Sequence, residues 1–357
     1  MSSQVGEATA GPLENASGMP RPDAVRATAP ALPLVLTLAI LALTYWCVDT
    51  VSPALPVMRD DLRLSATGAG FVVAFFFGGR LVANLPAAIF VTRGGPRWTA
   101  LIGAVALLAG SLLVGMAAGE PFLLPARAVQ GAGVALLATA GLLSVLRALP
   151  GGGSAMTAFN VASGVGSSGG LLVGGILTST IGWRSIFWLS AGIAGLLFAG
   201  ALSARPIAAA GGATRASPPN AALESAPPLR GATAAACVAN LLVYCNYAIW
   251  VVALPLYANG RFGATAEQIG VLLLIVNAIH LLAAFPAWRI IRRAGAPAAL
   301  GLGFATTGIG LALALATPTA GWLWAPMAVY AVGQVAGNSA AGDLILRLGG
   351  GGGRAVG

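Results

Sequence analysis

The sequence contains no lysine, so all nineteen basic residues of the 357-residue chain are arginine. Without lysine there is no Walker A phosphate-binding loop, no Schiff base to pyridoxal phosphate or retinal, and no Ser–Lys catalytic dyad. This absence argues against an ATP-driven pump and against a rhodopsin.

Charge of either sign is scarce. Only 8% of the residues are charged and 57% are hydrophobic, and the mean hydropathy is +0.87. A soluble domain carries roughly 25% charged residues, so this chain cannot cover a water-facing surface and a soluble enzyme is excluded. Disordered chains combine low hydrophobicity with high charge, which excludes disorder for most of the length. The composition indicates a polytopic protein of the lipid bilayer.

Binding and catalytic patterns are also few. The net charge of +9 does not indicate a nucleic-acid partner, because the arginines are scattered in ones and twos. The three cysteines, Cys47, Cys237 and Cys245, lie in apolar stretches without a C-x-x-C pair, which argues against a disulfide framework and a zinc site. The sequence has no H-E-x-x-H, no G-x-S-x-G and no acidic metal cluster. We expect no enzymatic activity, no metal and no cofactor.

Apolar segments of about 20–25 residues, long enough to cross a hydrocarbon core of ~30 Å, recur along the chain. In lipid each must be helical, so the sequence predicts an all-α membrane protein. The ten predicted spans are residues 32–57, 67–91, 97–118, 122–146, 155–180, 184–203, 232–257, 268–291, 296–317 and 321–346. The predicted domains are a flexible tail (1–31), a six-helix bundle (32–203), a linker (204–231), an incomplete four-helix bundle (232–347) and a glycine-rich tail (348–357).

The arginines predict the orientation. With the N-terminal tail in the cytoplasm, thirteen arginines fall in cytoplasmic segments, and four, at positions 59, 63, 184 and 261, fall on the opposite side. Cytoplasmic loops carry the excess of basic residues. We therefore expect a multi-pass protein of the cell membrane, a monomer, with both termini in the cytoplasm.

The two halves of the chain resemble each other at one place. Arg93-Gly94-Gly95 follows the second predicted span, and Arg293-Ala294-Gly295 follows the eighth. The shared R-x-G, 200 residues apart, predicts an internal repeat. Repeated halves around a midplane site are the architecture of secondary transporters.

Five motifs follow in order between about residues 32 and 347. Residues 54–56 read A-L-P, residues 88–97 read A-I-F-V-T-R-G-G-P-R, and residues 127–133 read R-A-V-Q-G-A-G. Residues 166–175 read G-S-S-G-G-L-L-V-G-G, and residues 182–187 read G-W-R-S-I-F. This series resembles the major facilitator superfamily, most closely its drug–proton antiporter branch, whose patterns are A-L-P, G-x-L-a-D-R-x-G-r-R, R-x-x-Q-G-x-G, G-x-x-x-G-P-x-x-G-G and G-W-R-x-x-F.

The chain departs from the family pattern at several points. Thr92 replaces the acidic residue of the first loop, Ala88 its leading glycine, and Leu171 the proline of the span-five signature. Members of the family have twelve or fourteen spans, so a chain of ten spans is expected to be truncated.

The resemblance implies secondary transport. We expect proton-coupled export of small amphipathic compounds by alternating access, with protons and a small-molecule substrate as partners. The alternative is a transport-inactive or regulatory membrane fragment.

The resemblance and the residues together give the candidate sites. Arg93, Gly95, Arg97 and Arg293 are predicted to form a cytoplasmic gate, or else to set the topology and bind lipid headgroups. A second group, Gly166, Gly170 and Gly174 with Gly175, is predicted to pack helices closely, and the family assigns this face to sealing against leak.

Polar and aromatic residues within the spans are the candidates for a substrate cavity. Tyr247 lies among those of the seventh span. His280 is interpreted first as a neutral, hydrogen-bonded histidine packed between helices, with contact to the substrate as the alternative. The predicted cavity residues are Gln130, Asn240, Tyr244, Trp250, Asn277 and His280.

Asp49 is the only acidic residue deep in a predicted helix of the first half, where a charge costs roughly 2.5–3.5 kcal/mol. At about 1.5 Å per residue, Arg127 matches its depth better than Arg80 does. We expect Asp49 to carry a proton opposite Arg127, the arginine to which the resemblance assigns proton handling, with Arg80 as the other possible partner. The alternative is a purely structural ion pair.

The predicted orientation has a direct test. Alkaline phosphatase fused after Gly357 should be inactive, because the enzyme matures only outside the cytoplasm. Strong phosphatase activity of this fusion would require an odd number of spans and would contradict the ten-helix prediction.

Overall fold

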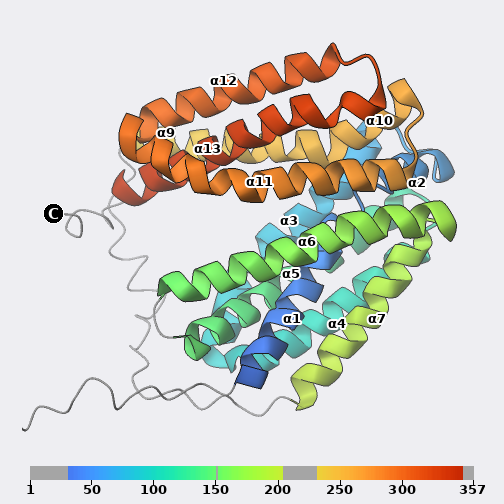
Figure 1. Cartoon of the computed structure of the whole chain (residues 1–357). Coiled ribbons are helices and arrows are strands. Elements are labelled where there is room, and N and C mark those ends of the chain that lie inside the picture. The colour runs from blue at the N-terminus through green and yellow to red at the C-terminus, as the bar shows by residue number, and fades with distance from the viewer. Residues whose placement is uncertain (1–30, 150–151, 204–230, 349–357) are drawn as a thin grey trace, which may run out of the picture.

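The computed structural model describes residues 31–149, 152–203 and 231–348, which form two bundles of helices (Figure 1). The described residues contain no strand, which confirms the all-α prediction. Apart from their edge residues, the predicted tails and linker lie outside the described ranges.

The first bundle contains the helices that precede residue 204. They are α1 (Ala31–Asp49), α2 (Leu55–Asp61), α3 (Ala66–Arg93), α4 (Gly95–Gly115), α5 (Glu120–Ala148), α6 (Gly152–Thr180) and α7 (Arg184–Ser203). The second bundle contains α9 (Gly231–Ala248), a π-helical turn (Ile249–Ala253), α10 (Leu254–Phe262), α11 (Ala266–Ala294), α12 (Ala296–Leu315), a 3₁₀ turn (Ala320–Trp322) and α13 (Trp324–Leu348).

Seven of these helices, or segments of them, are long and apolar enough to cross a membrane. They lie in α3, α4, α5, α6, α7, α11 and α12. The other three predicted spans fall on α1, on the run from α9 to α10, and on α13. In α1 the apolar segment is Leu34–Asp49, which is shorter than the seven segments named above.

The prediction of one continuous helix over residues 32–57 is wrong. The chain leaves the helix at Asp49, turns through residues 50–54, and begins α2 at Leu55. Proline has no backbone N–H, so Pro53 cannot donate to the Asp49 carbonyl four residues earlier. The amide of Ser52 donates to that carbonyl instead, at 3.0 Å. The span over residues 232–257 also differs: it contains the π-helical turn and continues to Phe262.

The internal repeat extends well beyond the R-x-G motif. Gly95 and Gly295 both have a φ of +80°, a conformation that strongly favours glycine. Gly133 approaches the backbone of Leu107, and 200 residues later Gly333 approaches Thr307 in the same way. The pairs α4–α5 and α12–α13 are therefore packed alike, in the same register.

Glycines bring α6 against α1 without room for a side chain. A Cβ atom at Gly166 would lie 2.0 Å from the Ala42 carbonyl oxygen, and one at Gly170 would lie 2.5 Å from the Trp46 oxygen. Gly175 points the other way, toward Ala266 of the second bundle, at 2.6 Å from its oxygen.

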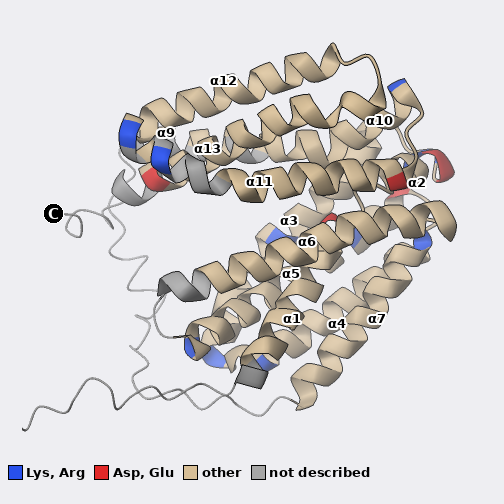
Figure 2. Cartoon of the chain, in the orientation of Figure 1, with Lys and Arg blue, Asp and Glu red and all other residues tan. Residues whose placement is uncertain are grey.

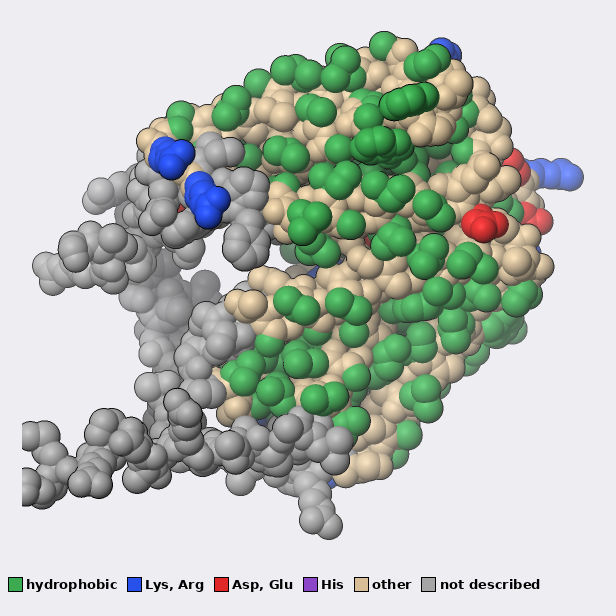
Figure 3. Space-filling view, in the orientation of Figure 1, with side chains coloured by type: hydrophobic (Ala, Val, Ile, Leu, Met, Phe, Trp, Pro, Cys, Tyr) green, Lys and Arg blue, Asp and Glu red, His purple; other side chains and the backbone are tan. Residues whose placement is uncertain are grey.

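The bundles are packed together at one end and stand apart at the other. At the end that bears α2 and α10, one apolar core contains residues of both bundles, among them Met58, Leu254 and Leu273. Nearer the opposite end, each apolar cluster belongs to a single bundle. We call these the closed end and the open end. Figure 3 shows the surface hollowed between the bundles at the open end, on the left of the view.

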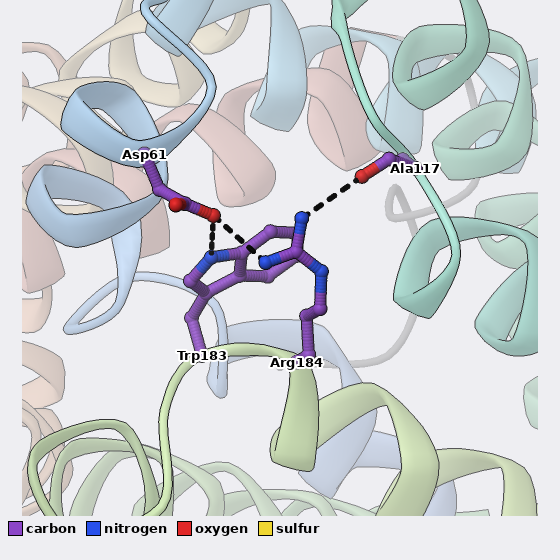
Figure 4. A network of polar contacts seen from close by, with 4 residues as sticks. All are labelled: Asp61, Ala117, Trp183 and Arg184. Carbon is purple, nitrogen blue, oxygen red and sulfur yellow. Dashed lines mark hydrogen bonds and ion pairs between the residues drawn. The ribbon is translucent and has the colours of Figure 1, made fainter.

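A network of polar contacts holds α2 in place at the closed end (Figure 4). The Asp61 carboxylate accepts hydrogen bonds of 2.8 Å from the Trp183 indole and from the Arg184 guanidinium. Arg184 also donates to the Ala117 carbonyl at 3.2 Å. These bonds join α2 to the turn before α7 and to the loop after α4, and they lower the pKa of Asp61, mainly through the Trp183 and Arg184 donors.

The close contact of α6 with α1 predicts that a glycine-to-alanine substitution destabilises the protein at this contact and not at an open position. We expect Gly166→Ala to lower the melting temperature in detergent, because the added methyl must push two backbones apart, at about 1–3 kcal/mol. Gly192→Ala is the matched control, since a Cβ there meets nothing within 4 Å. Equal melting temperatures for the two variants would contradict the packing described above.

The Asp61 network predicts a stability difference that depends on pH. A lowered carboxyl pKa stabilises the folded state above the ordinary value of 3.8, and the contribution is lost as the pH falls through the lowered pKa. We expect Asp61→Asn to lower the melting temperature slightly at neutral pH, since an exposed ion pair contributes at most about 1 kcal/mol. The gap should close in strong acid. Asp60→Asn, which removes the neighbouring exposed carboxyl group, is the matched control.

Candidate functional site

Asp49 lies where the two bundles meet. Its side chain is 5% exposed, and it accepts hydrogen bonds from the Ser167 hydroxyl of α6 and from the Tyr247 hydroxyl of α9. Val51, two residues after Asp49, belongs to the core shared by both bundles. Val48, the residue before it, belongs to a core of the first bundle alone. The carboxyl group therefore lies at the inner limit of the closed end.

Tyr247 reaches Asp49 from the last turn of α9, just before the π-helical turn. Its ring is held edge-on by Phe77 of α3, at 5.7 Å between centroids, and by Trp250, at 5.3 Å. A π-helical turn inserts an extra residue into a helix and is frequent at functional sites. Here it begins at Ile249, two residues after Tyr247.

Arg80 of α3 is the basic residue that acts electrostatically on this group. Its guanidinium donates a 3.0 Å hydrogen bond to the Tyr45 hydroxyl and lies within electrostatic range of Asp49 and of Tyr247. Asp49 thus has two hydroxyl donors and one cation within electrostatic range, without an ion pair to it among the described residues.

The predicted ion pair between Asp49 and Arg127 is wrong. Arg127 is 1% exposed, and its guanidinium donates to the Val72 carbonyl at 3.2 Å and to the Gln130 side chain. It also lies over the Phe76 ring, at 4.4 Å. The two residues are expected at similar depths in the membrane, but their side chains point in different directions. The Arg127 side chain points from α5 toward α3, whereas the Asp49 side chain faces α6 and α9.

The predicted cavity residues divide between two places. Gln130 is fully buried inside the first bundle, where it donates to Ser111 at 3.0 Å. Trp250 is buried beside Tyr247, and Asn277 donates across the bundle interface to Ser168 at 2.8 Å. His280, one turn further along α11, is half-buried and makes no hydrogen bond among the described residues. The side chains of Asn240 and Tyr244 lie outside the described part of the chain.

The predicted gate residues lie at the open end, where Figure 2 shows basic residues on both bundles. Arg97 donates to the carbonyls of Ala201 and Leu202, at 3.1 and 2.7 Å, and so binds the end of α7 within its own bundle. Arg93 and Arg293 are exposed at the ends of α3 and α11. Among the described residues, no side chain of the predicted gate contacts the opposite bundle in this arrangement.

Two residues of the site were absent from the predicted set. Ser167 lies in the glycine-rich stretch 166–175, where the glycines dominate the pattern. Tyr247 is one of several polar residues of its span, and its contact with a residue 198 positions away has no local sequence signal.

Comparison with known proteins places this geometry in a family. Three curated relatives are the multidrug resistance protein Stp of Mycobacterium tuberculosis (32% identity; 39% of this chain, 27% of that protein), the puromycin resistance protein pur8 of Streptomyces alboniger (34%; 47% and 34%), and the cephamycin export protein CmcT of Amycolatopsis lactamdurans (30%; 54% and 41%). The aligned part of the chain thus spans less than half the length of each of these relatives.

Solved structures share the fold. A point mutant of the nucleoside transporter NupG superposes with a TM-score of 0.70 at 12% identity, over 89% of this chain and 88% of that one. A D-xylose–proton symporter superposes with a TM-score of 0.63 at 15% identity, over 87% and 81%. The sequence pattern of the Major Facilitator Superfamily matches residues 36–357. The chain belongs to the Major Facilitator Superfamily.

Proposed function

We propose that this protein is a secondary transporter that exports small amphipathic compounds in exchange for protons. The observation that carries the proposal is Asp49, a carboxyl group enclosed where the two bundles meet. A charge inside a membrane protein costs roughly 2.5–3.5 kcal/mol and is rare without a function.

The partners of Asp49 suit a proton carrier. A hydroxyl group both donates and accepts hydrogen bonds, so Ser167 and Tyr247 can remain bonded to a carboxylate or to a carboxylic acid. A direct ion pair with an arginine would favour only the charged form. Arg80, near but bonded to Tyr45, supports loading and release of a proton by balancing the charge from a distance.

The arrangement of the bundles supports alternating access. They share one apolar core at the closed end and have separate cores toward the open end, which is how a carrier open to one side is built. The arginine asymmetry of the sequence assigns the open end to the cytoplasm, so the cleft would take up its substrate from the cytoplasm of a cell.

The relatives support the substrate class. Their names refer to multidrug resistance, puromycin resistance and cephamycin export. Near Asp49, the second bundle contributes the aromatic pair Tyr247 and Trp250, and Asn277 is one of few polar groups between the bundles. An aromatic surface with few polar groups suits compounds with apolar bodies and one or two polar anchors.

Asp49→Asn tests the proposal, because asparagine keeps the shape and cannot carry a proton. In proteoliposomes, we expect gradient-driven transport of a puromycin-like probe to fall at least about tenfold, while probe binding and the melting temperature stay near those of the unchanged protein. Asp60→Asn, which replaces an exposed carboxyl group by the same chemistry, is the control. Full gradient-driven transport by Asp49→Asn would refute the proposal.

A further inference from the structure

The hydrogen bond from Tyr247 to Asp49 connects the two bundles through a group that can change its charge. The other two polar contacts between the bundles among the described residues lack this property. Asn277 donates to Ser168 at 2.8 Å, and the Glu267 amide donates to Ser179 at 3.0 Å. Neither contact involves an ionisable side-chain group, so proton uptake leaves both unchanged.

Each element around Asp49 contributes a defined group. From α6 it is Ser167 and from α9 it is Tyr247, while α3 contributes the Arg80 guanidinium, bonded to Tyr45 of α1. The cation of α5, Arg127, is directed away. The one bond of Asp49 that leaves its own bundle is the one from Tyr247, among the contacts of the described residues.

The strength of this bond depends on the charge of Asp49. Hydrogen bonds to an ionised acceptor are roughly twice as strong as neutral ones, and a site away from water strengthens them further. When Asp49 is ionised, the bundles are therefore tied most firmly in the arrangement described here. When Asp49 takes up a proton, the tie weakens.

An exchanger needs such a tie. A carrier that turned over while empty would let protons through without moving substrate, so the empty, deprotonated form must be held still. A ligand shifts a conformational equilibrium only by its differential affinity for the two states. The proton neutralises Asp49, and a substrate bound between the bundles would compete for the Tyr247 hydroxyl; either event would release the bundles.

We propose that Tyr247 is the residue that couples the charge of Asp49 to the movement of the bundles. Its bond to Asp49 holds the empty, deprotonated transporter in the arrangement in which the two bundles are separated at the open end. This inference rests on the proposed proton-coupled function. Tyr247 acts through Asp49 and is a positioning residue: its hydroxyl prevents uncoupled turnover and is not required for carrying the proton.

Tyr247→Phe removes the hydroxyl and keeps the ring between Phe77 and Trp250. In proteoliposomes without any substrate, we expect this variant to raise the proton influx driven by a pH gradient roughly tenfold, the shift that corresponds to loss of one charge-assisted bond. Tyr330→Phe is the control: its hydroxyl bonds to the Asn246 carbonyl within the second bundle, and it should leave the influx unchanged. The double variant Asp49→Asn/Tyr247→Phe should show no extra influx.

A measurement of the bundles themselves needs no transport. Spin labels on Thr92→Cys of α3 and Ala294→Cys of α11, both exposed at the open end, would report the separation of the bundles in a protein whose three cysteines are replaced by alanine. In otherwise unchanged protein we expect a single long distance at alkaline pH and a broader distribution in acid. Tyr247→Phe should give the broad distribution at both.

The outcomes separate the two proposals. If Tyr247→Phe keeps the low proton influx and the pH-dependent distances of the unchanged protein, or if Tyr330→Phe raises the influx equally, the role of Tyr247 is refuted while proton coupling stands. If Asp49→Asn transports normally with a gradient, proton coupling through Asp49 fails, whatever Tyr247→Phe does to the distances.

Discussion

Hydrocarbon offers no hydrogen-bonding partner, so a carboxyl group inside a membrane protein depends on the groups that the protein itself supplies. Asp49 obtains them from two different bundles, through Ser167 and Tyr247. Because Pro53 ends α1 just beyond it, the carboxyl group stands where the chain turns and where the shared apolar core begins. The same residue is therefore a structural contact and the group best placed to respond to a proton, and the contact between the bundles depends on its charge.

The two halves of the chain share their helix packing but differ in their buried polar side chains. Gly110 approaches the backbone of Gln130, and 200 residues later Gly310 approaches Tyr330 in the same way. Yet Gln130 bonds to a buried arginine, whereas Tyr330 bonds to a backbone carbonyl of α9. Glycines thus fix the helix packing of both halves equally, and the side chains between them are free to differ. The polar network of Arg127 and Gln130 belongs to one half only.

The helices could be predicted because length and apolarity decide them, and most predicted spans agree with helices of the structure to within a few residues. The break after Asp49 was missed, although Pro53 is a visible signal for it. Asp49 itself could be selected, since a lone acidic residue in an apolar helix is costly. Its partner could not: depth along a helix gives no direction around it, and so Arg127 was chosen in place of the hydroxyl groups. Tyr247 comes from the other bundle, and only the folded chain brings the two together.

The α6 helix is the element on which the two bundles depend most. Its neighbouring serines face different ways: Ser167 donates to Asp49 in its own bundle, and Ser168 accepts from Asn277 in the other. Toward the closed end, Gly175 and Gly270 bring the backbones of α6 and α11 together with no side chain between them. A packed core resists tilting and sliding because its side chains interlock. A contact between two glycines has no such side chains. Movement of the bundles is then opposed by the shared apolar core at the closed end and by a few single hydrogen bonds. Of those bonds, the one to Asp49 is the one whose strength a proton changes.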